Sequence, residues 1–271
     1  MEVILFHTSS NGIVVMNKFV GLVIFFSSLA KIHCASAESA TTVSKQSDIS
    51  KKFLQIQVEK NDTIDTAIKS IVSHYPQQAA SIISTALDLY PDKYKEIIHA
   101  AITVQPTLAE EVVTMALLKE IGSSASIVET AINADPSYID SVVTAAALLT
   151  PDQLSEIVRI AVIIEPDSAD YIVRSLAKEH PSKIVDILQS AISAVPFVGE
   201  YVVEALLAVF PNDAEVVITT AVRESNKHRE QIKRIIKAAK NSGVDIEKLE
   251  AYAISGGATT EELSQVLGDT K

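Results

Sequence analysis

Apolar residues recur along the middle of the chain with a 15-residue period. When each unit is counted from Pro76 onward, positions 4, 7, 8, 11 and 12 are mostly apolar and position 9 is polar. Positions 7 and 8 are branched aliphatic residues, as in Ile97-Ile98 and Val142-Val143, and position 11 is usually Ala. These spacings follow one face of an α-helix, and the period-2 alternation of a strand is missing. Each unit therefore predicts one helix of about 11 residues, roughly 16 Å long.

Proline occurs only at the first position of these units. Neighbouring prolines are one period apart except for a single gap of two periods, where Ile121 stands at the expected position. The nine prolines are Pro76, Pro91, Pro106, Pro136, Pro151, Pro166, Pro181, Pro196 and Pro211. Proline disfavours helical geometry in the residue before it, so each proline is expected to end one helix. A short oxygen-bearing side chain usually follows at position 2 and an acid often at position 5, which predicts a capping box at the start of the next helix.

The unit that begins at Ile121 lacks its proline but keeps the apolar face, for example at Ile127 and Val128. We expect Gly122 to supply the turn there, because glycine adopts backbone conformations that other residues avoid. Without a proline, this position is interpreted as a softer joint midway along the array.

The short linkers between units require successive helices to run antiparallel, as αα-hairpins that each contain two units. One unit has too little apolar surface to fold alone, so neighbouring units must stack. The predicted fold class is all-α, an α-solenoid of antiparallel helices with a proline-punctuated, single-helix repeat. Over residues 61–240 the chain resembles α-solenoid repeat proteins generally, although the tetratricopeptide and ankyrin signatures are absent. Ten clear units span 76–225, and degenerate end units cover 61–75 and 226–240.

The last unit, 226–240, keeps Ile232 and Ile236 but carries Lys233 and Lys237 at positions that are apolar elsewhere. Polar residues on one face are typical of a terminal capping repeat. This basic unit is interpreted either as a solvated cap that complements an acidic body or as a docking site for an acidic partner or anionic surface.

Residues 241–271 leave the 15-residue register and predict a C-terminal helical cap. A short helix is expected at 245–254, and Gly256-Gly257 predicts a turn after it. Thr259 or Thr260 is expected to cap a last helix that ends at Leu267.

The N-terminus has the pattern of an export signal, with a basic start at Met16-Asn17-Lys18, an apolar run at 19–29 and an Ala-Ser-Ala site at 35–37. Cleavage is predicted after Ala37, which would make residues 1–37 an upstream extension plus signal peptide. Translation could begin at Met1 or at Met16. A retained membrane anchor is the alternative, but the apolar run is shorter than the roughly 20 residues that a span needs.

Residues 38–60 are interpreted as a flexible leader, in which 51–60 could form a first, irregular helix. The predicted signal makes the protein exported, either periplasmic or secreted. Cys34 is the only cysteine and would leave with the signal, so the mature chain would contain no disulfide.

The formal net charge of −11 argues against a nucleic-acid partner, because phosphate contacts need clustered Lys and Arg. The chain is 48% hydrophobic, so an acidic surface also keeps it soluble. The remaining histidines are scattered without metal-ligand spacing, and phosphate-loop, nucleophile-elbow and zinc-protease motifs are missing. We therefore expect no enzyme activity, no cofactor and no bound metal.

A protein or peptide partner is the expected ligand, and the candidate contact residues are aromatic or basic. They are Tyr171, Tyr201, Lys227, Arg229, Lys233, Arg234 and Lys237. Two functions remain open: a scaffold or adaptor that binds a protein or peptide in the cell envelope, and a protein whose amphipathic helices associate with a lipid surface. The apolar face of each predicted helix is wide enough to contact neighbouring helices in two directions. This width, together with the acidity of the chain, favours the scaffold function. The sequence does not fix the oligomeric state.

Overall fold

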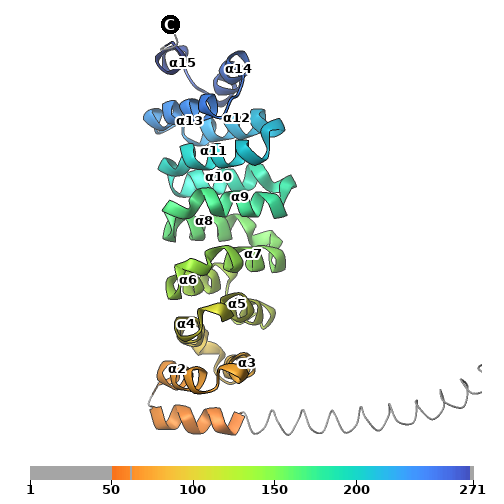
Figure 1. Ribbon diagram of the computed structural model, residues 1–271, viewed down its shortest axis with the longest axis vertical. Helices are drawn as coiled ribbons and strands as arrows, with labels where there is room; N and C mark the ends of the chain where they lie inside the picture. Colours follow the sequence, from red (N-terminus) through yellow and green to blue (C-terminus); the bar gives the residue numbers. More distant parts are fainter. Residues whose placement is uncertain (1–50, 62, 269–271) are drawn as a thin grey trace, which may run out of the picture. The chain divides into compact units, whose positions relative to one another are not determined.

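The computed structural model describes residues 51–61 and 63–268. The predicted signal sequence and residues 38–50 of the predicted leader lie outside the described residues. The chain divides into two compact units, of which the second begins at Leu54 and contains every helix labelled in Figure 1. Residues 51–61 are helical, and Leu54 is fully buried. This part of the predicted leader is therefore helical.

The helices of the second unit form two layers. The even-numbered layer contains α2 (Ile64–His74), α4 (Tyr94–Val104), α6 (Ser124–Ala134), α8 (Leu154–Ile164), α10 (Ile184–Ala194), α12 (Ala214–Glu224) and α14 (Ile246–Gly256). The odd-numbered layer contains α3 (Ala79–Leu89), α5 (Ala109–Leu118), α7 (Ile139–Leu149), α9 (Ala169–Glu179), α11 (Gly199–Val209), α13 (Arg229–Asn241) and α15 (Thr260–Leu267). Each helix packs against the next one and against the helix after that (Figure 1). The fold is an all-α solenoid, as the periodicity predicts.

The core consists of the five apolar positions of each unit. In α8, for example, Leu154 is 4% exposed, and Ile157, Val158, Ala161 and Val162 are fully buried. Alanine at position 11 is fully buried wherever it occurs between Ala86 and Ala221, so neighbouring helices approach closely at that point. Positions 7, 8, 11 and 12 are buried in all ten clear units, and position 4 is buried in all of them except at the half-buried Tyr94 and Ala214. The 15-residue pattern alone therefore locates the helices and their inward faces.

The predicted capping box at the prolines is wrong. Each proline begins a three-residue 3₁₀ turn, and the residue before it makes two backbone hydrogen bonds. The N–H of Tyr90 donates to the carbonyl of Ala86, and the N–H of Lys93 donates to the carbonyl of Tyr90, both at 2.9 Å. The N–H of Tyr94 donates to the carbonyl of Pro91, so the N–H groups at positions 3 and 4 are both bonded within the backbone and the side chain at position 2 finds no free donor there.

Side-chain capping does occur at one proline among the described units. There the carboxylate of Asp135, the residue before Pro136, accepts a hydrogen bond from the N–H of Ser137. The acidic residues at position 5 lie in the first turn of their helices, where their negative charge interacts favourably with the positive end of the helix dipole, as expected.

The joint between α5 and α6 differs from the prediction in its turn residue. Glu120, not Gly122, adopts the left-handed conformation, with φ +52°, and Ser123 caps α6 by accepting the N–H of Ser126 at 3.3 Å. Gly122 is required for another reason: a Cβ there would lie 2.7 Å from Cζ of Tyr94. The Tyr94 hydroxyl is in turn hydrogen-bonded to Ser126 at 2.8 Å. Glycine therefore makes room for a side chain from α4.

The C-terminal cap forms as predicted. Asp245 caps α14, Gly257 ends it with φ +103°, and Thr259 forms a capping box with Glu262 at the start of α15. Helix α14 packs against α12, and the hydroxyl of Thr219 in α12 donates to the carbonyl of Tyr252 in α14 at 3.2 Å. Among the described residues, no helix is long and apolar enough to cross a membrane.

Candidate functional site

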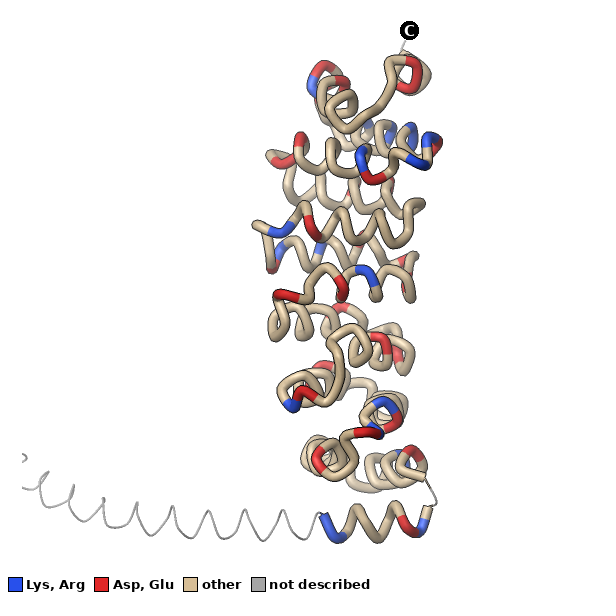
Figure 2. Tube along the Cα trace, turned by 180° about the vertical axis from the view of Figure 1, so that it is seen from behind, with Lys and Arg blue, Asp and Glu red and all other residues tan. Residues whose placement is uncertain are grey.

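Most cations of the last repeat unit lie along α13, where blue segments gather in Figure 2. Lys233 and Lys237 stand at positions that are apolar in the other units, and here the helix buries Ile235 and Ala239 instead. Together with Ile232 and Ile236, these residues form an i, i+3, i+4, i+7 face. The helix is thus turned about its axis relative to the other units, and its cations face outward.

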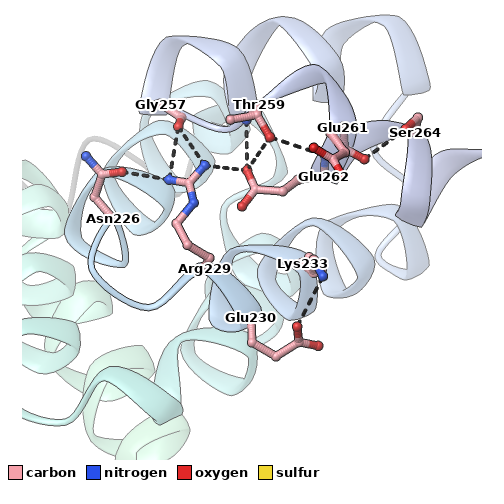
Figure 3. Close-up of polar contacts among 9 residues, drawn as sticks. All are labelled: Asn226, Arg229, Glu230, Lys233, Gly257, Thr259, Glu261, Glu262 and Ser264. Atoms are coloured by element: carbon pink, nitrogen blue, oxygen red, sulfur yellow. Dashed lines mark hydrogen bonds and ion pairs between the residues drawn. The ribbon is translucent and has the colours of Figure 1, made fainter.

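Arg229 is not part of the outward set. Its guanidinium bonds a carboxylate oxygen of Glu262 at 2.6 Å and the side-chain oxygen of Asn226 at 2.8 Å (Figure 3). It also donates to the carbonyl of Gly257 at 3.4 Å. These contacts join α13 to the turn that precedes α15, so the structure assigns Arg229 to holding the C-terminal cap.

The carboxylate of Glu262 is the partner that makes this arrangement strong. Its side chain is 8% exposed, and both the N–H and the hydroxyl of Thr259 donate to the same oxygen that Arg229 contacts. Burial raises the pKa of Glu262, but the hydrogen bonds from Thr259 and the charge and hydrogen bond of Arg229 outweigh it and hold that pKa below its ordinary value. The ion pair is therefore formed at neutral pH.

The outward cations of α13 border a groove of about 510 Å³ between α13 and α15. Its lining residues are Glu230, Lys233, Arg234, Lys237, Lys240, Asn241, Gln265 and Val266. Lys240 belongs to the same basic unit but was not among the predicted contact residues, and the two α15 residues were missed altogether. Their place depends on how α15 folds back along α13, which helix periodicity does not determine.

Two of these cations have carboxylate partners. Lys233 lies 3.2 Å from Glu230 on the same helix, and Arg234 lies 3.6 Å from Glu200 of α11. Lys240 donates to the backbone carbonyl of Val266 at 3.4 Å, and its ammonium group has no carboxylate partner among the described residues. Lys237 is exposed and makes no ion pair with any described residue, and Lys227 is exposed in the turn before α13.

The two candidate tyrosines lie on neighbouring helices of the odd-numbered layer. Tyr171 of α9 is 44% exposed and Tyr201 of α11 is 56% exposed, and the two helices pack against each other. The guanidinium carbon of Arg174 is 5.4 Å from the ring centre of Tyr171, within cation–π range. Both tyrosines occupy position 6 of their units, so they stand at equivalent places on stacked helices.

Phe197 is a further aromatic residue that the sequence reasoning did not single out. It occupies position 2 of its unit, which was interpreted as a cap position, and its side chain is 58% exposed. A depression of about 400 Å³ is lined by Phe197, by His228 just before α13, and by Arg229 and Arg234 of that helix. We call Tyr171, Phe197, Tyr201, Lys233, Arg234 and Lys237 the aromatic–basic surface.

A second groove, of about 670 Å³, crosses the N-terminal part of the even-numbered layer. It is lined by Thr63, Asp65, Lys95, Glu96, His99, Glu129, Thr130 and Asn133. Asp65 is paired with Lys69 and Glu96 with Lys93, so two of its three carboxylates are compensated by lysines. In the described part of the chain, no group of three or more His, Cys, Asp or Glu side chains could hold a metal ion.

The aromatic–basic surface has to be interpreted from its own geometry. No protein-family model matches the chain, and the comparisons with curated proteins and with solved structures gave no significant match.

Proposed function

We propose that the protein is a non-enzymatic scaffold or adaptor that binds a protein or peptide partner through its aromatic–basic surface. The predicted export signal would place this activity in the cell envelope or outside the cell. One observation carries the proposal: Tyr171 and Tyr201 are half-exposed at equivalent positions of stacked helices, with Phe197 close by in sequence. Tyrosine is among the residues that contribute most to protein interfaces.

The spacing of the helices suits an extended partner segment. Packed helices lie about 8–10 Å apart, so two residues at equivalent positions are separated by a similar distance. A polyproline II segment rises about 3.1 Å per residue and returns to the same side every third residue. Such a segment laid across α9 and α11 would direct every third side chain toward the next tyrosine.

A lipid surface is a poorer fit for these helices. Positions 7 and 8 are at most 5% exposed in every unit from Ile82 to Ile218, so the broad apolar face is used in packing between helices. What remains outside is a set of separate aromatic and aliphatic side chains among charges. A lipid-binding helix would need its apolar face free.

The test is affinity capture from the protein's own cells with the wild type and with a Tyr171→Ala/Tyr201→Ala variant. We expect the wild type to retain a partner that the double variant loses, since truncating two central aromatic contacts costs roughly 2–4 kcal/mol of binding. Val185→Ala/Val216→Ala is the matched control, because these valines are exposed to a similar degree on the even-numbered layer.

Two results would contradict the proposal. One is capture of the same proteins by the wild type and the tyrosine variant. The other is co-sedimentation of the wild type with neutral or anionic liposomes without any tyrosine-dependent protein partner, which would favour the lipid-associated function.

A further inference from the structure

The groove between α13 and α15 carries the opposite charge to the chain as a whole. The protein has a formal net charge of −11, yet the groove presents Lys233, Arg234, Lys237 and Lys240 against the single carboxylate of Glu230. These cations follow one stripe of α13, at the spacings that bring side chains together on a helix surface. A segment with several carboxylates would therefore meet complementary charge here and repulsion from most of the remaining surface.

The carboxylates that already face these cations are weakly held. Glu230 is 74% exposed although it lies 3.2 Å from Lys233, and Glu200 lies 3.6 Å from Arg234, beyond hydrogen-bond distance. Exposed ion pairs of this kind contribute little to stability, so an incoming carboxylate could replace them at small cost. Lys237 and Lys240 need no such exchange, because neither has a carboxylate partner among the described residues.

The walls of the groove suit a narrow chain better than a broad anionic surface. Asn241 and Gln265 offer side-chain amides that can bond a peptide backbone, and Val266 adds an apolar contact. Glu247, Glu250 and Glu261 are exposed on the neighbouring helices α14 and α15, where Lys248 is the one exposed cation among the described residues. A membrane or a nucleic acid that spread over this end of the stack would meet those carboxylates.

We propose that the groove between α13 and α15 binds an acidic peptide segment of the partner, with Lys233, Arg234, Lys237 and Lys240 as its contacts. In the free protein, Glu230 and Glu200 pair with the cations that the peptide carboxylates would contact. This inference rests on the proposed function, because it names the chemistry of the partner that the neighbouring tyrosines bind.

The experiment measures fluorescence anisotropy of a labelled, end-blocked peptide of six glutamates with the full chain at low ionic strength. We expect binding that weakens as salt is added, since the contacts are exposed charges. Lys237→Gln/Lys240→Gln should weaken the affinity about 10-fold, the effect of losing two exposed pairs. Lys69→Gln/Lys95→Gln removes the same charge from the even-numbered layer and should change the affinity less than about 2-fold.

Glu230→Gln tests the same groove through a variant that should raise the affinity for the peptide. Because it removes the carboxylate that competes with the peptide, this variant should bind hexaglutamate about 2- to 5-fold more tightly. A gain in affinity cannot arise from a misfolded variant, so it keeps the proposal testable if the lysine variant is damaged.

The proposal is overturned if hexaglutamate does not bind the wild type, or if the lysine and glutamate variants leave its affinity unchanged. The proposal is also overturned if the protein binds anionic vesicles tightly and if Lys237→Gln/Lys240→Gln binds them as tightly as the control Lys69→Gln/Lys95→Gln. A tyrosine-dependent partner found in cells without hexaglutamate binding would refute this inference alone. Hexaglutamate binding without such a partner would instead refute the proposed function.

Discussion

At the scale of single residues, the backbone satisfies its own hydrogen bonds at the repeat boundaries. The residue before each proline closes one helix with its N–H and opens the next turn with its carbonyl. Proline fits the first position of that turn because it has no N–H to satisfy and its φ is already near the required value. Within the ten clear units, the one boundary without proline has a side-chain cap from Ser123 and a left-handed residue at Glu120.

Glu120→Gly should stabilise the protein. The left-handed conformation is strained for a residue with a Cβ, and glycine removes that strain while adding some unfolded-state entropy. We expect a net gain of about 0.5–1 kcal/mol, measured as a raised midpoint of urea unfolding.

Glu165→Gly is the matched control for this substitution. Glu165 occupies the same position of its unit but has φ −125°, so glycine there should cost about 0.5–1 kcal/mol. A loss of stability in both variants would contradict the strain assigned to Glu120.

At the scale of elements, the C-terminal cap depends on a few polar contacts as well as on packing. Helix α15 buries Leu263 and Leu267, and its start is fixed to α13 through Arg229 and Glu262. The same contacts give Arg229 a structural partner in Glu262, although the sequence places it in a basic cluster. Charged residues can be counted from the sequence, but the partner that each charged side chain meets depends on which helix folds back over it.

The pH dependence of this cap follows from the lowered pKa of Glu262. A carboxyl whose pKa is depressed in the folded state contributes stability above its unfolded pKa and loses it as pH falls through the folded value. At pH 7, Glu262→Gln should therefore speed hydrogen exchange in α15 by about 5- to 30-fold, equivalent to roughly 1–2 kcal/mol.

The difference between the wild type and Glu262→Gln should shrink as the pH falls through the lowered pKa of Glu262, where the wild-type carboxyl becomes protonated. Glu261→Gln is the control, because Glu261 is an exposed neighbour on the same helix. Equal exchange in the wild type and Glu262→Gln at pH 7, or a difference that persists in acid, would show that the ion pair does not hold the cap.

At the scale of the whole second unit, the repeat period was enough to predict the fold. Positions 7, 8, 11 and 12, such as Ile157 and Ala161, are buried in all ten clear units, so sequence and packing share one period. The period fails where the units stop being equivalent. It could not predict the rotation of α13, the return of α15 along it, or the space that Gly122 leaves for Tyr94.

The candidate site was predictable only in part, for the same reason. Tyr171 and Tyr201 could be placed together because they share a position in stacked units. Phe197 was missed because position 2 was assigned to capping, and Lys240 because its role depends on α15. Contacts that repeat can be predicted from one unit, whereas contacts at the end of the array require the three-dimensional structure.

The most direct test of the binding surface is photo-crosslinking in living cells with p-benzoylphenylalanine placed at position 171, 201 or 216. The account predicts that probes replacing Tyr171 and Tyr201 attach to the same protein, through a segment flanked by Asp or Glu. The probe replacing Val216, which is exposed on the other layer, should not attach to it. Attachment from all three positions alike, or only to lipid, would contradict the account.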